Sequence, residues 1–286
     1  MKKLILLSFV IFLMSFVSDK PAYQLFDANG KAVSYSDMIK EIKKADFIFI
    51  GELHNNAIAH WMELEITKSV FEAKKEKLVL SAEMFESDNQ LIMDEYLNGT
   101  ISQKNFEDEM RLWPNHNTDY KPLVEFANEN NLHFVAANIP RRYASAVYHN
   151  GFDGINKFSE EAKKYCAPLP IEYDTTLACY ADMLKMSGMN GHGAANLPKS
   201  QAMKDATMAH FIGKDWKKGQ TVIHYNGAYH SQNHEGTVWY LQKKYPKAKI
   251  VVITTVTQAD ISKLDDESKN TGDFILAVDE NVTTTY

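Results

Sequence analysis

The sequence predicts an α/β fold: a mainly parallel β-sheet flanked by helices, with a helical cap inserted before the last strands. Three observations support this class. Short apolar runs of strand type alternate with stretches of helical periodicity, as expected for βαβ units. Polar side chains follow directly on the ends of several of these runs. Between about residues 141 and 219 no strand-like run is present.

The strand and helix pattern can be assigned along the chain from hydrophobic periodicity. Six apolar runs are predicted to be strands: 46–50, 77–83, 132–137, 221–225, 249–256 and 273–278. Four further stretches are predicted to be helices: 58–73, 88–98, 120–131 and 234–245. Asn55 or Asn56 precedes the first of these helices and is suited to cap it.

The stretch from about 141 to 219 is predicted to be a cap that lies over the edge of the sheet where the strands end. It is interrupted by glycines and prolines, and it contains the two cysteines, Cys166 and Cys179. In an exported protein this pair would be able to form one disulfide, and two buried free thiols are the alternative. Residues 19–286 are predicted to form a single domain that includes the cap.

Residues 1–18 are predicted to be a signal peptide. Lys2 and Lys3 precede the apolar run 4–17, which is shorter than the roughly 20 residues that span a bilayer. An uncleaved anchor is the alternative. No cysteine lies near residue 20, so there is no lipobox. We therefore expect an exported protein, either periplasmic or membrane-associated.

The charge of the chain bears on its partners. The formal net charge is −6, from 37 acidic and 31 basic side chains. Nucleic-acid-binding proteins usually carry a basic footprint, because they must neutralise phosphates. No nucleic acid is expected as a partner.

Ionisable side chains stand at the carboxyl ends of the predicted strands. Glu52 and His54 follow the first run, Glu83 ends the second, and His230 follows the fourth. In open α/β sheets ligands bind outside these ends. The four residues are the predicted catalytic set if the chain is a hydrolase, and His54, Glu83 and His230 are the predicted ligands of a divalent metal. Ordinary loop polarity is the alternative and, for Glu83, a structural ion pair.

A second group of residues is predicted to bind a cofactor. Arg141 and Arg142 start the cap, and guanidinium groups bind carboxylates in a bidentate manner; surface salt bridges are the alternative. The cap region contains several tyrosines whose phenolates are able to ligate haem iron, and composition does not choose among them: Tyr143, Tyr148, Tyr165, Tyr173 and Tyr180. His192 ends a methionine repeat whose soft donors suit copper(I) or haem iron. Packing is the alternative for all of these residues. The predicted cofactor-binding residues are His54, His60, Arg141, Arg142, Tyr143, Tyr180, His192 and Asp205.

Two members of this group lie on predicted helices. His60 falls in the first turns of the helix that follows His54. Asp205 shares one helical face with Met208 and Ala209, and an acid on such a packed face is expected to point at the strand ends or to pair with an arginine.

The chain resembles the ChaN-like haem-binding uptake proteins in five ordered segments: FIFIGELHNNAIAH, LSAEMFESDNQ, AANIPRRY, QAMKDATMAHFI and HYNGAYHSQNHEG. This family shares a superfamily with the Tiki-type metalloproteases and the erythromycin esterases. The resemblance covers roughly residues 40–256. It implies an α/β core with a helical cap, export, and haem held at a dimer interface by tyrosine and histidine contacts. The positions that match are Gly51, Glu52, His54, His60, Glu83, Asn138, Arg141, Asp205 and His230.

Two functions from different classes follow from these observations. The first is an exported protein of haem or iron uptake, with haem or another iron chelate as ligand and with a second copy of the chain and an outer-membrane receptor as further partners. The second is a metal-dependent hydrolase of the peptidase or esterase type, built on the strand-end residues. A serine nucleophile is not expected, because the chain lacks a GxSxG elbow. The sequence favours haem or iron binding.

Overall fold

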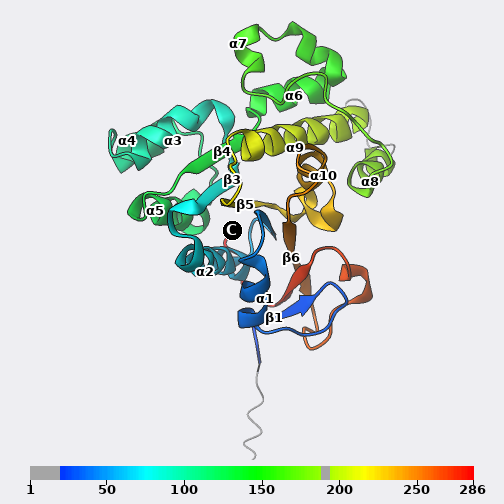
Figure 1. Cartoon of the computed structure of the whole chain (residues 1–286). Helices are drawn as coiled ribbons and strands as arrows, with labels where there is room; N and C mark the ends of the chain where they lie inside the picture. The colour runs from blue at the N-terminus through cyan, green and yellow to red at the C-terminus, as the bar shows by residue number, and fades with distance from the viewer. Residues whose placement is uncertain (1–19, 188–193) are drawn as a thin grey trace, which may run out of the picture.

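The computed structural model describes residues 20–187 and 194–286 (Figure 1). The predicted signal peptide and His192 lie outside the described residues, so both stay predictions. Within the described ranges no helix is long and apolar enough to cross a membrane.

A seven-stranded sheet forms the centre of the molecule, in the order β1-β7-β6-β2-β5-β3-β4. β1 runs antiparallel to β7, and the other neighbouring pairs are parallel. The strands are β1 (Tyr23–Asp27), β2 (Phe47–Glu52), β3 (Leu78–Glu86), β4 (Phe134–Asn138), β5 (Thr221–Gly227), β6 (Ile250–Gln258) and β7 (Phe274–Asp279). Because β5 lies between β2 and β3, the carboxyl ends of these three strands meet at one edge of the sheet.

Helices cover both faces of this sheet (Figure 1). They are α1 (Tyr35–Ile42), α2 (Ala57–Lys74), α3 (Gln90–Leu97), α4 (Gln103–Glu109), α5 (Lys121–Glu129), α6 (Arg141–Asn150), α7 (Glu160–Lys163), α8 (Ala178–Ser187), α9 (Leu197–Lys214) and α10 (Thr237–Lys244). A short π-helical segment, His116–Tyr120, precedes α5.

The alternation of side chains along each strand decides which helices pack on which face. Ile48 and Ile50 of β2 belong to the larger apolar cluster, which includes α1, α2, α3 and α5. Phe47 and Phe49 point to the opposite face and pack with residues of α9 and α10. Both faces of β2 are therefore buried in apolar clusters, and its polar side chain, Glu52, stands at its carboxyl end.

The predicted cap region is helical where it is described, but its last helix belongs to the body of the molecule. Met208, Ala209 and Ile212 of α9 pack directly against strand residues of the sheet. Helices α6 and α8 contact α9, and in Figure 1 α6 and α7 stand on the side of α9 away from the sheet. α9 is thus a sheet-covering helix that also carries the outer helices.

The two cysteines do not form the disulfide that the sequence left open. Cys166 and Cys179 are both free and buried. They lie in different apolar clusters, Cys166 with Ile155 and Met203, and Cys179 with Tyr180. Burial raises the pKa of the Cys166 thiol to about 12, so this thiol is chemically quiet at neutral pH.

All six predicted strands are present, and so are the four predicted helices, with ends that shift by a few residues. Sequence reasoning missed β1, α1 and α4. β1 is a short edge strand that pairs only with β7. Only Leu25 and Phe26 of β1 are buried, so this strand has no continuous apolar run of the kind that identified the other strands.

Candidate functional site

A cavity of about 670 Å³ opens at the carboxyl edge of the sheet. It combines an apolar wall with ionisable groups of both signs. Its lining comes from strand ends, from the loop before the π-helical segment, from the start of α6 and from α9: His54, Glu83, Glu86, Arg111, Leu112, Trp113, Pro114, Asn138, Ile139, Arg141, Arg142, Lys204 and His230. The strand-end residues and the first residues of the predicted cap therefore share one cavity.

The His54 imidazole is fixed in place by contacts with Glu52 and Trp113. Its Nδ1 lies 2.6 Å from Glu52 Oε1, an oxygen that also accepts a hydrogen bond from Tyr120 Oη at 2.7 Å. Because this oxygen acts as an acceptor, we assign the hydrogen to His54 Nδ1. The ring packs edge-on against Trp113, with centroids 4.9 Å apart. The His54 side chain is 35% exposed, whereas Glu52 is buried. Because Nδ1 carries the hydrogen, the Nε2 lone pair is the free one, beside Gly227 and Glu83.

The pKa values of this pair are shifted in the same direction. Burial and the neighbouring charge of Glu63 raise the pKa of Glu52 to about 8. Burial alone would lower the pKa of His54, but the hydrogen bond to Glu52 and the charge of Glu83 outweigh it and raise that pKa. The site thus retains protons more readily than its isolated groups would.

Glu83, His230 and Asp205 form a buried chain beside His54. His230 Nε2 lies 3.1 Å from Glu83 Oε1, and His230 Nδ1 lies 2.5 Å from Asp205 Oδ1. The Gly227 N–H donates to Glu83 Oε2 at 2.9 Å. Glu83 therefore has the histidine partner that its buried position required, and Asp205 pairs with this histidine rather than with an arginine.

Charge pairing fixes the protonation of this chain. Burial would lower the pKa of His230, but Glu83 and Asp205 outweigh it and raise that pKa to about 10. Burial would raise the pKa of Glu83, but the charge of His230 holds it well below its usual range. An imidazolium between two carboxylates is the result.

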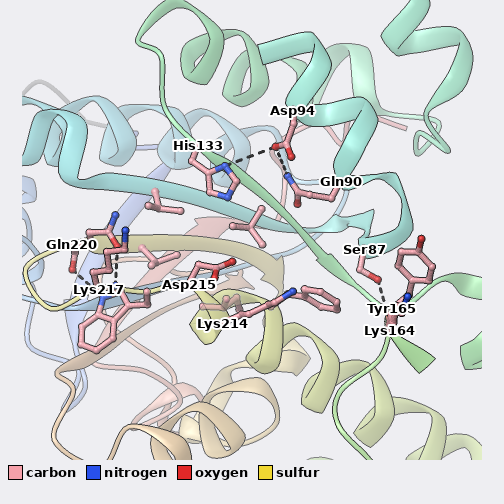
Figure 2. A pocket seen from close by; sticks show the side chains of 16 residues that line it. Ser87, Gln90, Asp94, His133, Lys164, Tyr165, Lys214, Asp215, Lys217 and Gln220 are labelled. Carbon is pink, nitrogen blue, oxygen red and sulfur yellow. Dashed lines mark hydrogen bonds and ion pairs between the residues drawn. The ribbon is translucent and has the colours of Figure 1, made fainter. Parts of the chain in front are cut away.

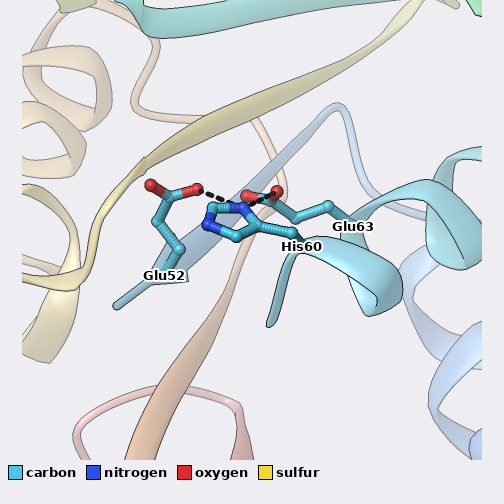
Figure 3. A group of neighbouring side chains, drawn as sticks. All are labelled: Glu52, His60 and Glu63. Carbon is cyan, nitrogen blue, oxygen red and sulfur yellow. Dashed lines mark hydrogen bonds and ion pairs between the residues drawn. The ribbon is translucent and has the colours of Figure 1, made fainter. Parts of the chain in front are cut away.

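A second buried cluster lies behind Glu52 (Figure 3). His60 Nδ1 is 3.0 Å from Glu63 Oε2 and 3.4 Å from Glu52 Oε2. Within the described ranges, Glu52, His60 and Glu63 are the group of three whose donor atoms all lie within 4.8 Å of one another. The predicted metal set of His54, Glu83 and His230 does not form such a group among these residues.

The two predicted arginines play different parts. Arg142 pairs with Asp88 at 2.7 Å and stacks on the Tyr143 ring, 4.3 Å from its centroid. Arg141 lines the same cavity, and so does Lys204 of α9. Neither of them makes an ion pair within 4 Å in the part of the chain that is described, so these two cations are free to meet an anionic ligand.

The predicted tyrosines lie outside this cavity. Tyr180 is fully buried, and its hydroxyl donates to Asp205 Oδ2 at 2.8 Å. It supports the Glu83–His230–Asp205 chain and does not face the cavity. Tyr143 is half-buried, packs on Phe158 and accepts a hydrogen bond from Arg142 at 3.2 Å.

Several residues of the site were missed by sequence reasoning. Glu63 had a signal, because it lies three residues after His60 and thus on the same helical face. Asp119 had none. It comes from the π-helical segment, and its Oδ2 approaches His60 Nε2 at 3.5 Å only because the fold brings that segment against α2. Trp113 likewise comes from a loop that the sequence does not connect with the strand ends. Lys204 had a signal, because it adjoins Asp205 in the cap segment that was predicted to lie over the strand ends.

Another cavity, of about 740 Å³, lies elsewhere on the molecule (Figure 2). It is lined by residues from the beginnings of β3, β4 and β5 and from the end of α9. Figure 2 shows several of its labelled polar residues engaged with one another, among them His133 with Asp94 and Lys217 with Gln220. It contains none of the strand-end residues, so the smaller cavity is the candidate site.

The family model for haem-binding uptake proteins of the Tiki superfamily, ChaN, matches residues 38–241. The chain belongs to this family. No curated protein sequence matches the chain significantly. The matched range includes all residues that line the cavity, from His54 to His230, and the cluster of Glu52, His60 and Glu63.

The fold is similar to that of a family member of known structure. The chain superimposes on ChaN of Campylobacter jejuni, described with cofacial haem binding, with a TM-score of 0.65 and 20% identity, over 89% of this chain and 96% of that one. The type III effector HopBA1 gives a TM-score of 0.46 at 12% identity, over 85% and 92% of the two chains. An erythromycin esterase gives 0.45 at 9%, over 90% and 83%. The similarity to the Campylobacter jejuni protein shows that the chain has the ChaN-like fold.

Proposed function

We propose that this chain is an exported haem-binding protein and that haem binds in the cavity at the carboxyl edge of the sheet. The observation that carries the proposal is the membership of the haem-binding uptake family over residues 38–241. The cavity supports it by size, since small-molecule sites occupy roughly 300–1,000 Å³, and by chemistry.

The donor set fits haem in two respects. Leu112, Trp113 and Ile139 offer an apolar wall for a porphyrin ring. Arg141 and Lys204 offer two cations that no carboxylate engages within 4 Å in the described structure, and haem carries two propionates. Charge-assisted hydrogen bonds of this kind are among the stronger ones in proteins.

His54 is the proposed iron ligand. Bound haem would supply an iron centre that takes a nitrogen or oxygen ligand from the protein. The hydrogen bond from Nδ1 to Glu52 fixes the tautomer in which Nε2 is the acceptor, which is the usual support of a metal-bound histidine. Tyr143 is the competing ligand: it does not line the cavity itself, but its hydroxyl accepts a hydrogen bond from Arg142, which does.

The proposal is tested by haemin titration of wild-type protein and matched variants. Arg141→Gln and Lys204→Gln are each expected to weaken haemin binding roughly 10-fold, because each removes one charge-assisted contact. Lys214→Gln is the control: it changes the same charge on the same helix but lines the other cavity. Equal affinity in all four proteins would place haem elsewhere.

The ligand assignment is tested by the visible spectrum of the complex. His54→Ala is expected to change the spectrum, and Tyr143→Phe to leave it unchanged. If the spectrum instead shows a tyrosinate charge-transfer band that Tyr143→Phe removes, haem binding stands and His54 is not the ligand.

Export, a periplasmic or membrane-associated location and a homodimer are part of the same proposal. They are supported by the apolar run 4–17 and by the family. Fractionation of cells that express the full chain, with mass determination of the mature N-terminus, tests cleavage and location. Sedimentation with and without haemin tests the dimer.

A metal-dependent hydrolase at the same edge is the second candidate. The observation that favours it is the buried chain from Asp205 through His230 to Glu83, ending beside His54. A protonated His54 is suited to act as a general acid, which contributes roughly 10²–10⁴ in rate. A screen of esters and peptides tests it, and hydrolysis that disappears in Glu83→Gln would support it.

A further inference from the structure

The cluster of Glu52, His60 and Glu63 behind the cavity contains an unusual set of unpaired acceptors. Glu52 and Glu63 are 1% and 0% exposed. In the described ranges no N–H or O–H group donates to Glu52 Oε2 or Glu63 Oε1, so the hydrogen bond that the two carboxyls can share needs a proton on one of them. Buried carboxylates ordinarily meet a basic side chain. In the described ranges neither Glu52 nor Glu63 has a lysine or arginine within 4 Å; their ion-pair partners are histidines.

The tautomer of His60 determines whether its Nδ1 can act as a metal ligand. His60 Nε2 lies 3.1 Å from the backbone carbonyl oxygen of His54, which can only accept, so Nε2 carries a hydrogen and donates. Its second neighbour, Asp119 Oδ2 at 3.5 Å, also favours a donor there. In the neutral ring Nδ1 then presents a lone pair to the two carboxylates.

Three lone pairs that converge in a dry space must share protons or hold a cation. The nitrogen and the carboxylate oxygens lie within 4.8 Å of one another, a span that one ion can bridge. A metal-bound histidine almost always donates its other ring N–H to a carbonyl or carboxylate. His60 already has this arrangement through His54 and Asp119.

We propose that Glu52, His60 and Glu63 bind a divalent transition metal ion such as Zn²⁺ or Mn²⁺. One imidazole and two carboxylates are ligands suited to these ions. Because all three side chains are buried, the site is shielded from solvent, and three protein ligands leave at least one coordination position for a further donor. It ties the end of β2 to the first turns of α2 and is separate from the haem cavity.

The site would also act on the cavity through one side chain. Glu52 uses Oε2 toward the cluster and Oε1 toward His54 and Tyr120. An ion on Oε2 fixes the carboxylate plane and with it the direction of the His54 ring. Glu52 is therefore a positioning residue that couples the two sites, and this coupling, unlike metal binding itself, rests on the proposed role of His54.

The test is the metal content of the purified full chain, followed by dialysis, reloading with Mn²⁺ or Zn²⁺ and thermal unfolding. Wild-type protein is expected to retain about one ion per chain and to unfold at a higher temperature with the ion than after chelation. Glu63→Gln is expected to lose both. Glu65→Gln, on the same helix but paired with the surface residue Lys68, is the matched control and is expected to behave as wild type.

A second pair of variants separates this site from the cavity. His54→Ala is expected to keep the ion, since His54 is not a ligand. Loss of the ion in His54→Ala or Glu83→Gln, together with its retention in Glu63→Gln, would place the metal in the cavity and overturn the proposal. Absence of a retained ion and of any thermal shift in wild-type protein would overturn it as well.

If Glu63→Gln does not fold, the number of imidazole ligands on the metal can still be measured on the wild-type chain. Pulsed electron paramagnetic resonance of the Mn²⁺-loaded wild-type chain is expected to show one coordinated imidazole. Two coordinated imidazoles would point to His54 and His230 and would contradict the assignment. Haemin binding is measured separately, so the proposed function and this inference succeed or fail independently.

Discussion

Gly227 is the residue on which the position of His54 depends. A Cβ atom built on Gly227 would lie 2.7 Å from His54 Nε2, closer than side-chain carbons approach nitrogen atoms. The backbone φ at Gly227 is −56°, so the requirement for glycine comes from space and not from the backbone conformation.

Gly227→Ala is therefore expected to displace the His54 imidazole and to weaken haemin binding about 10-fold or more, with little loss of stability. Haemin titration of the variant measures this. In the His54→Ala background the same change should have no further effect. An additive loss in the double variant would mean that Gly227 does not act through His54.

Asp205 stabilises His230 in its protonated form. It accepts hydrogen bonds from Tyr180 and Thr237 and contacts His230 Nδ1. Removing its charge leaves the imidazolium with Glu83 alone.

Asp205→Asn is expected to lower the pKa of His230 and to cost roughly 3–5 kcal/mol of unfolding free energy, as is typical when one partner of a buried ion pair is lost. Denaturant unfolding at pH 7 and histidine titration by NMR measure the two effects. Asp182→Asn, on the exposed face of α8, is the control. A change below 1 kcal/mol would show that Asp205 acts only as packing.

At the scale of elements, β2 and α2 form one functional unit. β2 delivers Glu52 and the loop with His54, Asn56 caps α2 by accepting from the Ala59 N–H at 2.9 Å, and α2 returns His60 and Glu63 to the end of the strand. The pKa values of Glu52 and Glu63 are each raised to about 8, mainly by burial. Because both carboxyl groups have a raised pKa, the stability of this unit depends on pH.

The sign follows from linkage. A carboxyl whose pKa is raised in the folded state binds more protons when folded than when unfolded between about pH 4.5 and 8, so stability falls as pH rises through that window. With a chelator present, wild type is therefore expected to lose more unfolding free energy than Glu63→Gln when the pH rises from 5 to 8. The difference is expected to be a few kcal/mol, since a pKa difference of one unit corresponds to about 1.4 kcal/mol. Urea unfolding at both pH values measures it. A difference that does not change with pH would contradict the raised pKa values.

The elements that sequence reasoning could assign are those whose signal is local. Every strand except β1 shows a continuous apolar run, and Glu52, His54, Glu83 and His230 lie close enough to the ends of these runs to be found. The tertiary neighbours could not be found in this way. Asp119 and Trp113 reach the site through a loop and a π-helical segment with no periodic pattern, and the inward direction of Tyr180 is set by packing between α8 and α9.

At the scale of the whole molecule, the parallel order β2-β5-β3 explains why residues far apart in sequence converge. Crossovers bring His54, Glu83 and His230 to the same edge, and α9 and α6 close the cavity from above with Lys204 and Arg141. Within the described ranges the candidate haem cavity and the cluster behind Glu52 lie back to back, joined by the Glu52 carboxylate. The sheet fixes both sites relative to each other.

The most direct test of the central claim is a haemin titration of the mature wild-type chain, followed by its visible spectrum, beside Arg141→Gln and Lys204→Gln. Saturable binding with a defined ligand spectrum, weakened in both variants and unchanged in Lys214→Gln, is the result that this account predicts. The absence of saturable binding in wild-type protein would contradict haem carriage by this chain.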